Sequence, residues 1–279
     1  MSLSVLQTIV RAARWTFRKN EFGLRAAMLP VFAIARRRNT HHLGLLGKSV
    51  EIVEPLWSVV DFVEIFWHQM YHFVSRREQP YIIDCGANVG MAVIYFMHLY
   101  PESSVVAFEP DPTVFSILQK NLSSFSVSGV TAINKAVWTS DSTMQFVDGG
   151  GVGGRLANCG AVSTAIDVEA VRLRPFLERK VDFLKIDIEG AELAVLRDCR
   201  SVLGNVDHVF VEFHGSPHRS QELHDLLSLL ADSGFRYYVT DARGDHRPLD
   251  FDWRWRRYDI QVNVFAVREE IEDVDGPRR

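Results

Sequence analysis

The stretch that most constrains the fold is Tyr81–Gly90, which reads YIIDCGANVG. It starts with apolar β-formers without a polar interruption, which is typical of a strand buried on both faces in a parallel sheet. Two glycines follow, and the apolar segment MAVIYFMHLY after them has helical periodicity. Glycine permits a sharp turn or a close approach of the backbone to a ligand. Strand, glycine loop and helix predict half of a Rossmann-type α/β unit.

The loop differs from a dinucleotide-binding loop in the residue that precedes it. Asp84 places a carboxylate at the strand end, where it would repel a diphosphate but accept hydrogen bonds from a cationic, amine-bearing ligand. S-adenosylmethionine is such a ligand. A Rossmann unit also needs an acid about 20 residues after the loop to bind the ribose hydroxyls, and the next predicted strand, SVVAFEPD, leads to Glu109. The spacing therefore predicts a site for S-adenosylmethionine.

A second polar group follows two later predicted strands, in VDFLKIDIEGAE and DHVFVEFHG. Its members alternate along the chain and are Lys185, Asp187, Glu189, Glu212 and His214. Alternate residues share one face of a strand, and open α/β sheets bind ligands at their carboxyl edge, so these side chains are expected to converge there. A core-facing lysine is costly unless it is paired, which also favours a site. We therefore predict that these are the catalytic residues.

The chemistry predicted for this group is proton removal. His214 is the simplest general base, because an unperturbed histidine pKa of about 6.5 leaves it available at neutral pH. Asp187 and Glu189 are alternatives for that role. The carboxylates and His214 could instead ligate a divalent ion, but Lys185 would compete for the carboxylates, so no metal site is predicted.

Four motifs resemble those of one family, the FkbM-type methyltransferases: YIIDCGANVG, VVAFEPDP, NKAV and DFLKIDIEGAE, the last being the most family-specific. The resemblance extends from about Trp57 to Val267. It implies a class I methyltransferase Rossmann-like fold, with a mostly parallel seven-stranded sheet, one antiparallel edge strand and helices on both faces. It also implies S-adenosylmethionine as cofactor. The acceptor implied is a hydroxyl on a sugar, glycan or secondary metabolite, although related sequences also methylate amide nitrogens.

The resemblance and the loop pattern together give the expected cofactor-binding residues. They are Asp84, Gly86, Asn88, Gly90, Glu109, Pro110, Asp111, Asn134, Ala136 and Asp187. Asn134 and Ala136 belong to a predicted third strand, GVTAINKAVW, whose end falls where class I methyltransferases hold the adenine edge. The segment Val50–Phe73 is expected to be a helix near the pocket, with Asp61 and Tyr71 either in the pocket wall or simply on the helix surface.

Other classes of protein fit less well. A protein that binds S-adenosylmethionine without turnover would leave the acid and histidine group without a purpose. A nicotinamide dehydrogenase is disfavoured by Asp84 and by the missing third glycine. The run Gly149–Gly154 lacks the G-K-[ST] ending of a phosphate loop and predicts a flexible hairpin tip. Trp253 and Trp255 lie among arginines, but one such cluster in an acidic domain predicts no nucleic-acid partner.

The charge is distributed unevenly along the 279-residue chain. Residues 1–48 hold nine basic residues and one acid, although the net charge of the whole chain is −4, so the remainder is acidic. We predict a basic amphipathic helical arm over residues 1–49, a methyltransferase domain over residues 50–268 and a disordered tail over residues 269–279. The uncharged run Ala26–Ala35 is shorter than the ~20 residues that span a bilayer.

Three roles stay open for the arm. It packs on the domain or on a second subunit of a homodimer, it makes peripheral contact with anionic lipid or a lipid-carried substrate, or it is a transit peptide.

The cysteines are Cys85, Cys159 and Cys199, which show no metal-ligand spacing and would leave one unpaired in any set of disulfides. They predict a cytoplasmic protein with free thiols.

Overall fold

The computed structural model describes residues 41–147, 155–156, 165–216, 222–242, 258 and 260–268. Residues 1–40 of the predicted arm, the run Gly149–Gly154, the cluster around Trp253 and Trp255, and the tail lie outside the described residues, so their predicted roles stay predictions. In the part of the chain that is described, no helix is both long and apolar enough to cross a membrane.

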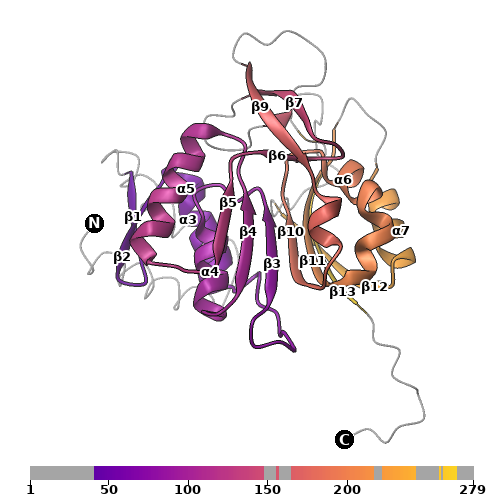
Figure 1. The fold of residues 1–279 in the computed structure, drawn as a ribbon, viewed down its shortest axis with the longest axis horizontal. Coiled ribbons are helices and arrows are strands. Elements are labelled where there is room, and N and C mark those ends of the chain that lie inside the picture. Colours follow the sequence, from indigo (N-terminus) through magenta and orange to yellow (C-terminus); the bar gives the residue numbers. More distant parts are fainter. Residues whose placement is uncertain are drawn as a thin grey trace, which may run out of the picture.

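The centre of the molecule is a seven-stranded sheet with the order β12-β13-β11-β10-β3-β4-β5 (Figure 1). Its strands are β3 (Tyr81–Cys85), β4 (Ser104–Phe108), β5 (Val130–Ile133), β10 (Val181–Ile186), β11 (Val206–His214), β12 (Phe235–Asp241) and β13 (Gln261–Arg268). The pairs from β5 to β11 are parallel, and β13 is antiparallel to both of its neighbours. The predicted fold is confirmed. The antiparallel strand, however, lies one position inside the edge, because β12 pairs along its outer side.

Helices cover both faces of the sheet, as predicted. They are α4 (Met91–Leu99) and α5 (Pro112–Phe125) on one face, and α6 (Glu192–Cys199) and α7 (Leu223–Asp232) on the other (Figure 1). Alternate strand residues point to opposite faces. Ile82 and Phe183 therefore pack with α4 and α5, while Ile83 and Leu184 pack with α6. Short 3-10 segments, Arg174–Leu177 and Arg200–Asn205, flank the second layer.

The chain ahead of the first sheet strand differs from the prediction. A hairpin of β1 (His42–Leu45) and β2 (Lys48–Glu51) stands where the end of the arm was expected to be helical, and the predicted boundary at residue 49 falls inside β2. Leu43, Leu45 and Val50 are buried in the domain core. The hairpin therefore belongs to the folded domain that holds the sheet, since its alternating apolar residues have a strand period rather than a helical one.

The helix expected over Val50–Phe73 is shorter in the structure. It consists of α3 (Pro55–Phe62), continued by a π-helical segment over Val63–Trp67. Pro55 stands at the start, where its missing N–H costs no hydrogen bond and its fixed φ suits a helix. π-helical turns are rare in proteins, and those that occur are often found at functional sites.

A second sheet has the order β6-β9-β7-β8 and continues from the end of β5 (Figure 1). Its strands are β6 (Ala136–Trp138), β7 (Ser142–Val147), β8 (Arg155–Leu156) and β9 (Ala165–Arg172). The predicted third strand GVTAINKAVW is therefore two strands in two sheets, separated at Asn134 and Lys135. Strand propensity favours both halves equally, whereas pairing partners decide which sheet each half joins.

Candidate active site

The glycine loop after β3 is shaped by close packing. Gly86 has φ +90° and Gly90 has φ +93°, a region that favours glycine. A Cβ on Gly86 would lie 1.9 Å from the backbone oxygen of Asp187, and one on Gly90 would lie 2.6 Å from Leu118 Cδ1. The close approach predicted from the glycines is thus to the turn after β10 and to α5. Direct contact of either glycine with the cofactor stays a prediction.

Glu109 is fixed in front of this loop. Its Oε2 accepts a hydrogen bond from Asn88 N at 2.9 Å, and its Oε1 accepts one from Asp111 N at 2.9 Å. Burial raises the pKa of Glu109 to about 7, although both hydrogen bonds oppose that shift. Asn88 Oδ1 is buried and has no hydrogen-bond partner among the described residues. The loop therefore presents an oriented carboxylate and an orphaned amide oxygen, both of which suit a ligand with hydroxyl or amine donors.

Three other predicted cofactor residues build the walls of this region. Asp111 caps α5, because its Oδ1 accepts a hydrogen bond from Thr113 N at 2.7 Å. Asn134 Nδ2 donates to the backbone oxygen of Pro110 at 3.1 Å and so ties the end of β5 to the loop after β4. Ala136 is buried in β6 of the second sheet. Contact of these residues with the cofactor stays a prediction.

Lys185 is a buried cation that joins two strands. Its Nζ lies 3.1 Å from Asp84 Oδ1 and 3.5 Å from Asp187 Oδ2, and it donates to Gly86 O at 2.9 Å. Burial lowers the pKa of Lys185, but the two carboxylates outweigh it and raise that pKa well above the usual range. Asp84, which was predicted to receive the cofactor amine, thus already has a cationic partner. Lys185 keeps its proton and is not a base.

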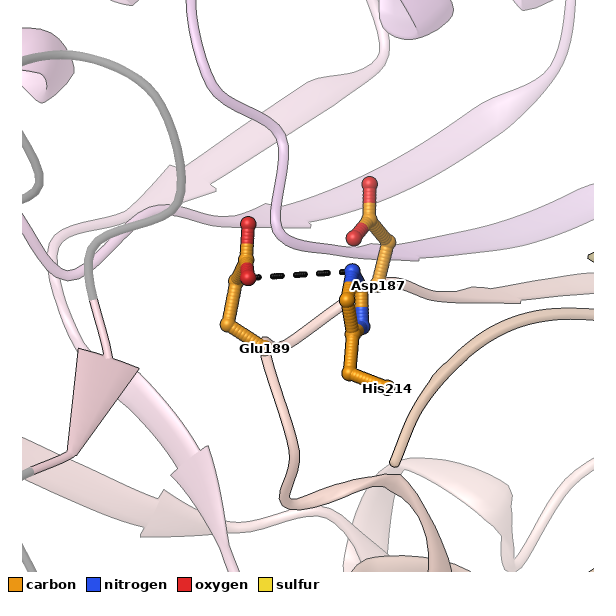
Figure 2. A group of neighbouring side chains, drawn as sticks. All are labelled: Asp187, Glu189 and His214. Atoms are coloured by element: carbon orange, nitrogen blue, oxygen red, sulfur yellow. Dashed lines mark ion pairs between the residues drawn. The ribbon is translucent and has the colours of Figure 1, made fainter. Parts of the chain in front are cut away.

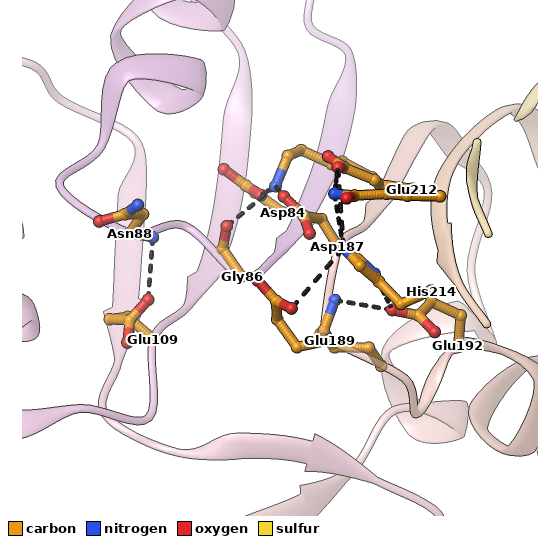
Figure 3. Close-up of polar contacts among 12 residues, drawn as sticks. Asp84, Gly86, Asn88, Glu109, Asp187, Glu189, Glu192, Glu212 and His214 are labelled. Carbon is orange, nitrogen blue, oxygen red and sulfur yellow. Dashed lines mark hydrogen bonds and ion pairs between the residues drawn. The ribbon is translucent and has the colours of Figure 1, made fainter. Parts of the chain in front are cut away.

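His214 lies at the end of β11 with carboxylates on both sides of its ring. Nδ1 is 2.9 Å from Glu192 Oε1, while Nε2 is 3.7 Å from Glu189 Oε2 and 3.7 Å from Glu212 Oε1 (Figures 2 and 3). Burial lowers the pKa of His214, but the hydrogen bond and charge of Glu192, helped by the other two, raise it to about 10. The imidazole is therefore charged at neutral pH. The prediction had assumed an unperturbed histidine.

The predicted convergence of this group is visible in the structure. One ligand atom each of Asp187, Glu189 and His214 lie within 4.8 Å of one another (Figure 2). A cation could be held by such a set, but each member already has a protein partner. Asp187 faces Lys185, and Glu189 Oε2 accepts a hydrogen bond from Tyr258 Oη at 2.5 Å. The group thus forms a network of ion pairs and hydrogen bonds, and the absence of a metal from it stays a prediction.

Two carboxylates of this region titrate near neutral pH. Burial, followed by repulsion from Asp187, raises the pKa of Glu212 to about 7. Burial and repulsion from Asp187 likewise raise the pKa of Asp61, on α3, to about 7. Asp61 is thus close enough to Asp187 for their charges to interact, while its place in a pocket wall stays a prediction. Tyr71 is buried, and its ring packs edge-on against Phe210 at 4.9 Å between centroids.

Two residues of the network carried no site prediction. They are Glu192 and Gln261, whose Nε2 contacts Glu212 Oε1 and lies 3.1 Å from His214 Nε2. A signal for Glu192 exists in the sequence. It shares a helix face with Leu196 and Cys199, both buried, so a carboxylate at that position has to be paired. No sequence pattern marks Gln261, because its place depends on the pairing of β13 with β11.

A family model described as Methyltransferase FkbM domain matches residues 84–237. The chain belongs to the FkbM methyltransferase family. "Methyltransferase 1" of Beauveria bassiana is 30% identical over 222 residues, which cover 68% of this chain and 86% of that protein. "31-O-demethyl-FK506 methyltransferase FkbM" of Streptomyces tacrolimicus is 28% identical over 170 residues, 48% of this chain and 65% of that protein. A solved FkbM methyltransferase from Methylobacillus flagellatus shares the fold, with a TM-score of 0.50, 16% identity and coverage of 85% of this chain and 58% of that one.

Membership of the FkbM family makes S-adenosylmethionine the methyl donor. The residues of the site fit that group, which is positively charged at its sulfonium and amine. Carboxylates outnumber cations here, since Asp84 and Asp187 face Lys185 while three glutamates face His214. The orphaned oxygen of Asn88 and the oriented carboxylate of Glu109 supply acceptors for ligand donors.

Proposed function

We propose that this FkbM methyltransferase transfers the methyl group to a hydroxyl oxygen of a sugar, glycan or secondary metabolite. The observation that carries the proposal is the set of partly exposed carboxylates, Asp187, Glu189 and Glu212, that meet around buried His214 at the carboxyl edge of β10 and β11 (Figure 3). Carboxylates accept hydrogen bonds from hydroxyls, and one of them can take up the hydroxyl proton. The name of the Streptomyces relative, which refers to an O-demethyl substrate, supports oxygen as the acceptor atom.

The protein has two tasks in such a reaction. When bound, S-adenosylmethionine supplies a methyl group that is already activated, so the chain's own residues orient the acceptor and remove its proton. Orientation alone can lower a barrier by roughly 7–11 kcal/mol in well-fixed cases. General-base help commonly adds about 10² to 10⁴ in rate. Fixed side chains with a matched pKa are therefore what the site has to provide.

Glu212 is the general base of this proposal. Its pKa of about 7 gives a useful fraction of ionised carboxylate at neutral pH and enough basicity to take up a proton. Its side chain keeps 22% of its surface exposed, whereas that of His214 keeps 1%. His214 is charged and enclosed, so we move the predicted base from His214 to Glu212. The imidazolium instead orients the carboxylates around it.

The test is to incubate cell extract with the protein and S-adenosylmethionine that carries a deuterated methyl group, then to find the labelled product by mass spectrometry. NMR of the purified product tells a methoxy group from an N-methyl group. A labelled methoxy group on a small molecule or glycan is the expected result. A label on nitrogen would make the protein an N-methyltransferase, and no label beyond that of a heat-denatured control would point to a protein that binds the cofactor without turnover.

A further inference from the structure

Glu192 is a buried acid at the first position of α6. Acids in the first turn of a helix are stabilised by the helix dipole even when they are exposed to water. The Glu192 side chain is only 1% exposed. Burying a carboxylate is costly unless it is paired and hydrogen-bonded, so the position of Glu192 has to be explained by its contacts.

Those contacts join two segments that are far apart in the sequence. Glu192 Oε1 lies 2.9 Å from His214 Nδ1, and the same oxygen accepts a hydrogen bond from Gly190 N at 2.9 Å (Figure 3). Gly190 has φ +104°, and Glu189 has φ +58°, an uncommon value for a residue other than glycine. One carboxylate thus holds both the turn that carries Glu189 and the ring of His214.

The other edge of the His214 ring, at Nε2, faces the carboxylates to which the acceptor hydroxyl binds in the proposed function. The groups around Nε2 are Glu189 Oε2 and Glu212 Oε1, each at 3.7 Å, and the side-chain amide of Gln261 at 3.1 Å, which accepts from a charged imidazole when its oxygen faces the ring. Asp187 lies beside them, and the ring of Tyr258 packs on that of His214 with centroids 4.8 Å apart. Turning the ring would break its bond to Glu192, so Nε2 stays directed at Glu189 and Glu212.

We propose that Glu192 is a positioning residue for methyl transfer: it keeps His214 charged and oriented, and His214 in turn holds Glu189 and Glu212 where the acceptor hydroxyl binds. The catalytic part of this inference rests on the proposed function. The structural part rests on the shared carboxylate oxygen and on the burial of both partners, each 1% exposed in its side chain. The increase of the His214 pKa by Glu192 agrees with it.

Two substitutions separate charge from shape. In Glu192→Gln the amide oxygen can still accept both hydrogen bonds that Oε1 accepts, but the negative charge is gone. Glu192→Ala removes both. The matched control is Asp225→Asn, which takes an acid from the first turn of the next helix, α7, where Asp225 pairs with Arg197 at 2.5 Å. Helix-dipole effects are common to both sites, whereas contact with His214 is specific to Glu192.

The first measurement is NMR titration of the His214 imidazole in the full-length protein without acceptor. In the wild type and in Asp225→Asn, His214 should keep its proton across about pH 6 to 8, because its pKa is about 10. In Glu192→Gln it should lose the proton within that range. The second measurement is turnover, which should fall about 10- to 100-fold in Glu192→Gln while the KM for S-adenosylmethionine changes less than about twofold.

The inference requires both changes in Glu192→Gln. If His214 titrates as in the wild type, or if turnover is unchanged, the positioning role is wrong. Circular dichroism and a thermal melt establish that each variant is folded, and the conservative Glu192→Gln decides if Glu192→Ala does not fold. A failure of the proposed function would instead appear in the wild-type product, as methyl on nitrogen or as no product. In that case the titration of His214 still tests whether Glu192 keeps the imidazole charged.

Discussion

Lys185 and Asp84 are register partners on the neighbouring parallel strands β10 and β3, and Lys185 Nζ lies 3.1 Å from Asp84 Oδ1. Register partners in a parallel pair present their side chains on the same face of the sheet. Both residues are buried, at 3% and 0% exposure. The charge of Asp84 at the end of the cofactor strand is therefore balanced from within the fold, and each residue explains how the other can be buried.

Asp84→Asn is expected to destabilise the protein by about 3–5 kcal/mol, because it leaves the Lys185 charge buried beside one remaining carboxylate, Asp187. The double variant Asp84→Asn, Lys185→Met should regain most of that loss, since it removes the unpaired charge. Urea unfolding of the wild type, both single variants and the double variant gives the free energies. If the double variant loses as much as the two single variants added together, the two residues are not a pair.

Glu109→Gln is expected to weaken S-adenosylmethionine binding by about 1–3 kcal/mol, the range for a hydrogen bond to a charged group. Glu109 is held by two backbone N–H groups, so its direction is fixed before a ligand arrives. Calorimetric titration with the cofactor measures the change, and Glu178→Gln, an exposed acid, is the matched control. Equal affinity in all three proteins would remove Glu109 from the cofactor site.

The parts of the fold that could be predicted are those with a local signal. The apolar run into Asp84, the glycines and the spacing to Glu109 define β3, the loop and β4, because each depends on residues adjacent in the chain. Alternation along two strand ends likewise predicted that Asp187, Glu189 and His214 converge, and they lie within 4.8 Å.

The parts that could not be predicted depend on pairing between distant segments. Strand propensity does not tell which sheet the residues after Asn134 join. It also does not tell that β12 is the edge strand and that β13 lies between β12 and β11. The charge state of His214 is a similar case. Its neighbours Glu212 and Glu189 were visible as alternating acids, but the group that binds Nδ1 comes from α6. A pKa depends on burial and on every nearby charge, and neither is present in a local pattern.

Treatment with a chelator distinguishes two interpretations of Asp187, Glu189 and His214, a network of ion pairs and hydrogen bonds or a metal site. The contacts of Asp187 with Lys185 and of Glu189 with Tyr258 satisfy these acids without an ion, so we expect turnover to be unchanged after dialysis against EDTA. Adding Mg²⁺ or Mn²⁺ should leave the rate where it was. Loss of activity with chelator, and recovery with a divalent ion, would instead assign Asp187, Glu189 and His214 as ligands.

The cofactor should stabilise the protein more at pH 8 than at pH 5. Asp61, Glu109 and Glu212 each have a pKa raised to about 7, above the ordinary values of 3.8, 4.5 and 4.5. Groups with a raised pKa contribute stability that is fully present below the ordinary pKa and is lost as pH rises through about 7. Burial is the largest cause of each increase, and a cationic ligand favours the ionised form of these buried acids, so it opposes the loss of stability at high pH. Thermal melts with and without S-adenosylmethionine across this range test it, and a shift independent of pH would contradict it.

The pH dependence of turnover tests the general base. A base works in its deprotonated form, so kcat/KM should rise as pH increases through about 7, the pKa of Glu212, and then level off. Glu212→Gln should lower turnover by about 10² to 10⁴ and abolish that rise, while cofactor affinity changes little, because Glu109 and Asn88 lie at a different loop. Glu169→Gln, an exposed acid that pairs with Lys135, is the control. A Glu212→Gln enzyme that keeps both its rate and its rise near pH 7 would move the base to Asp187, the more exposed of the other two carboxylates in the group.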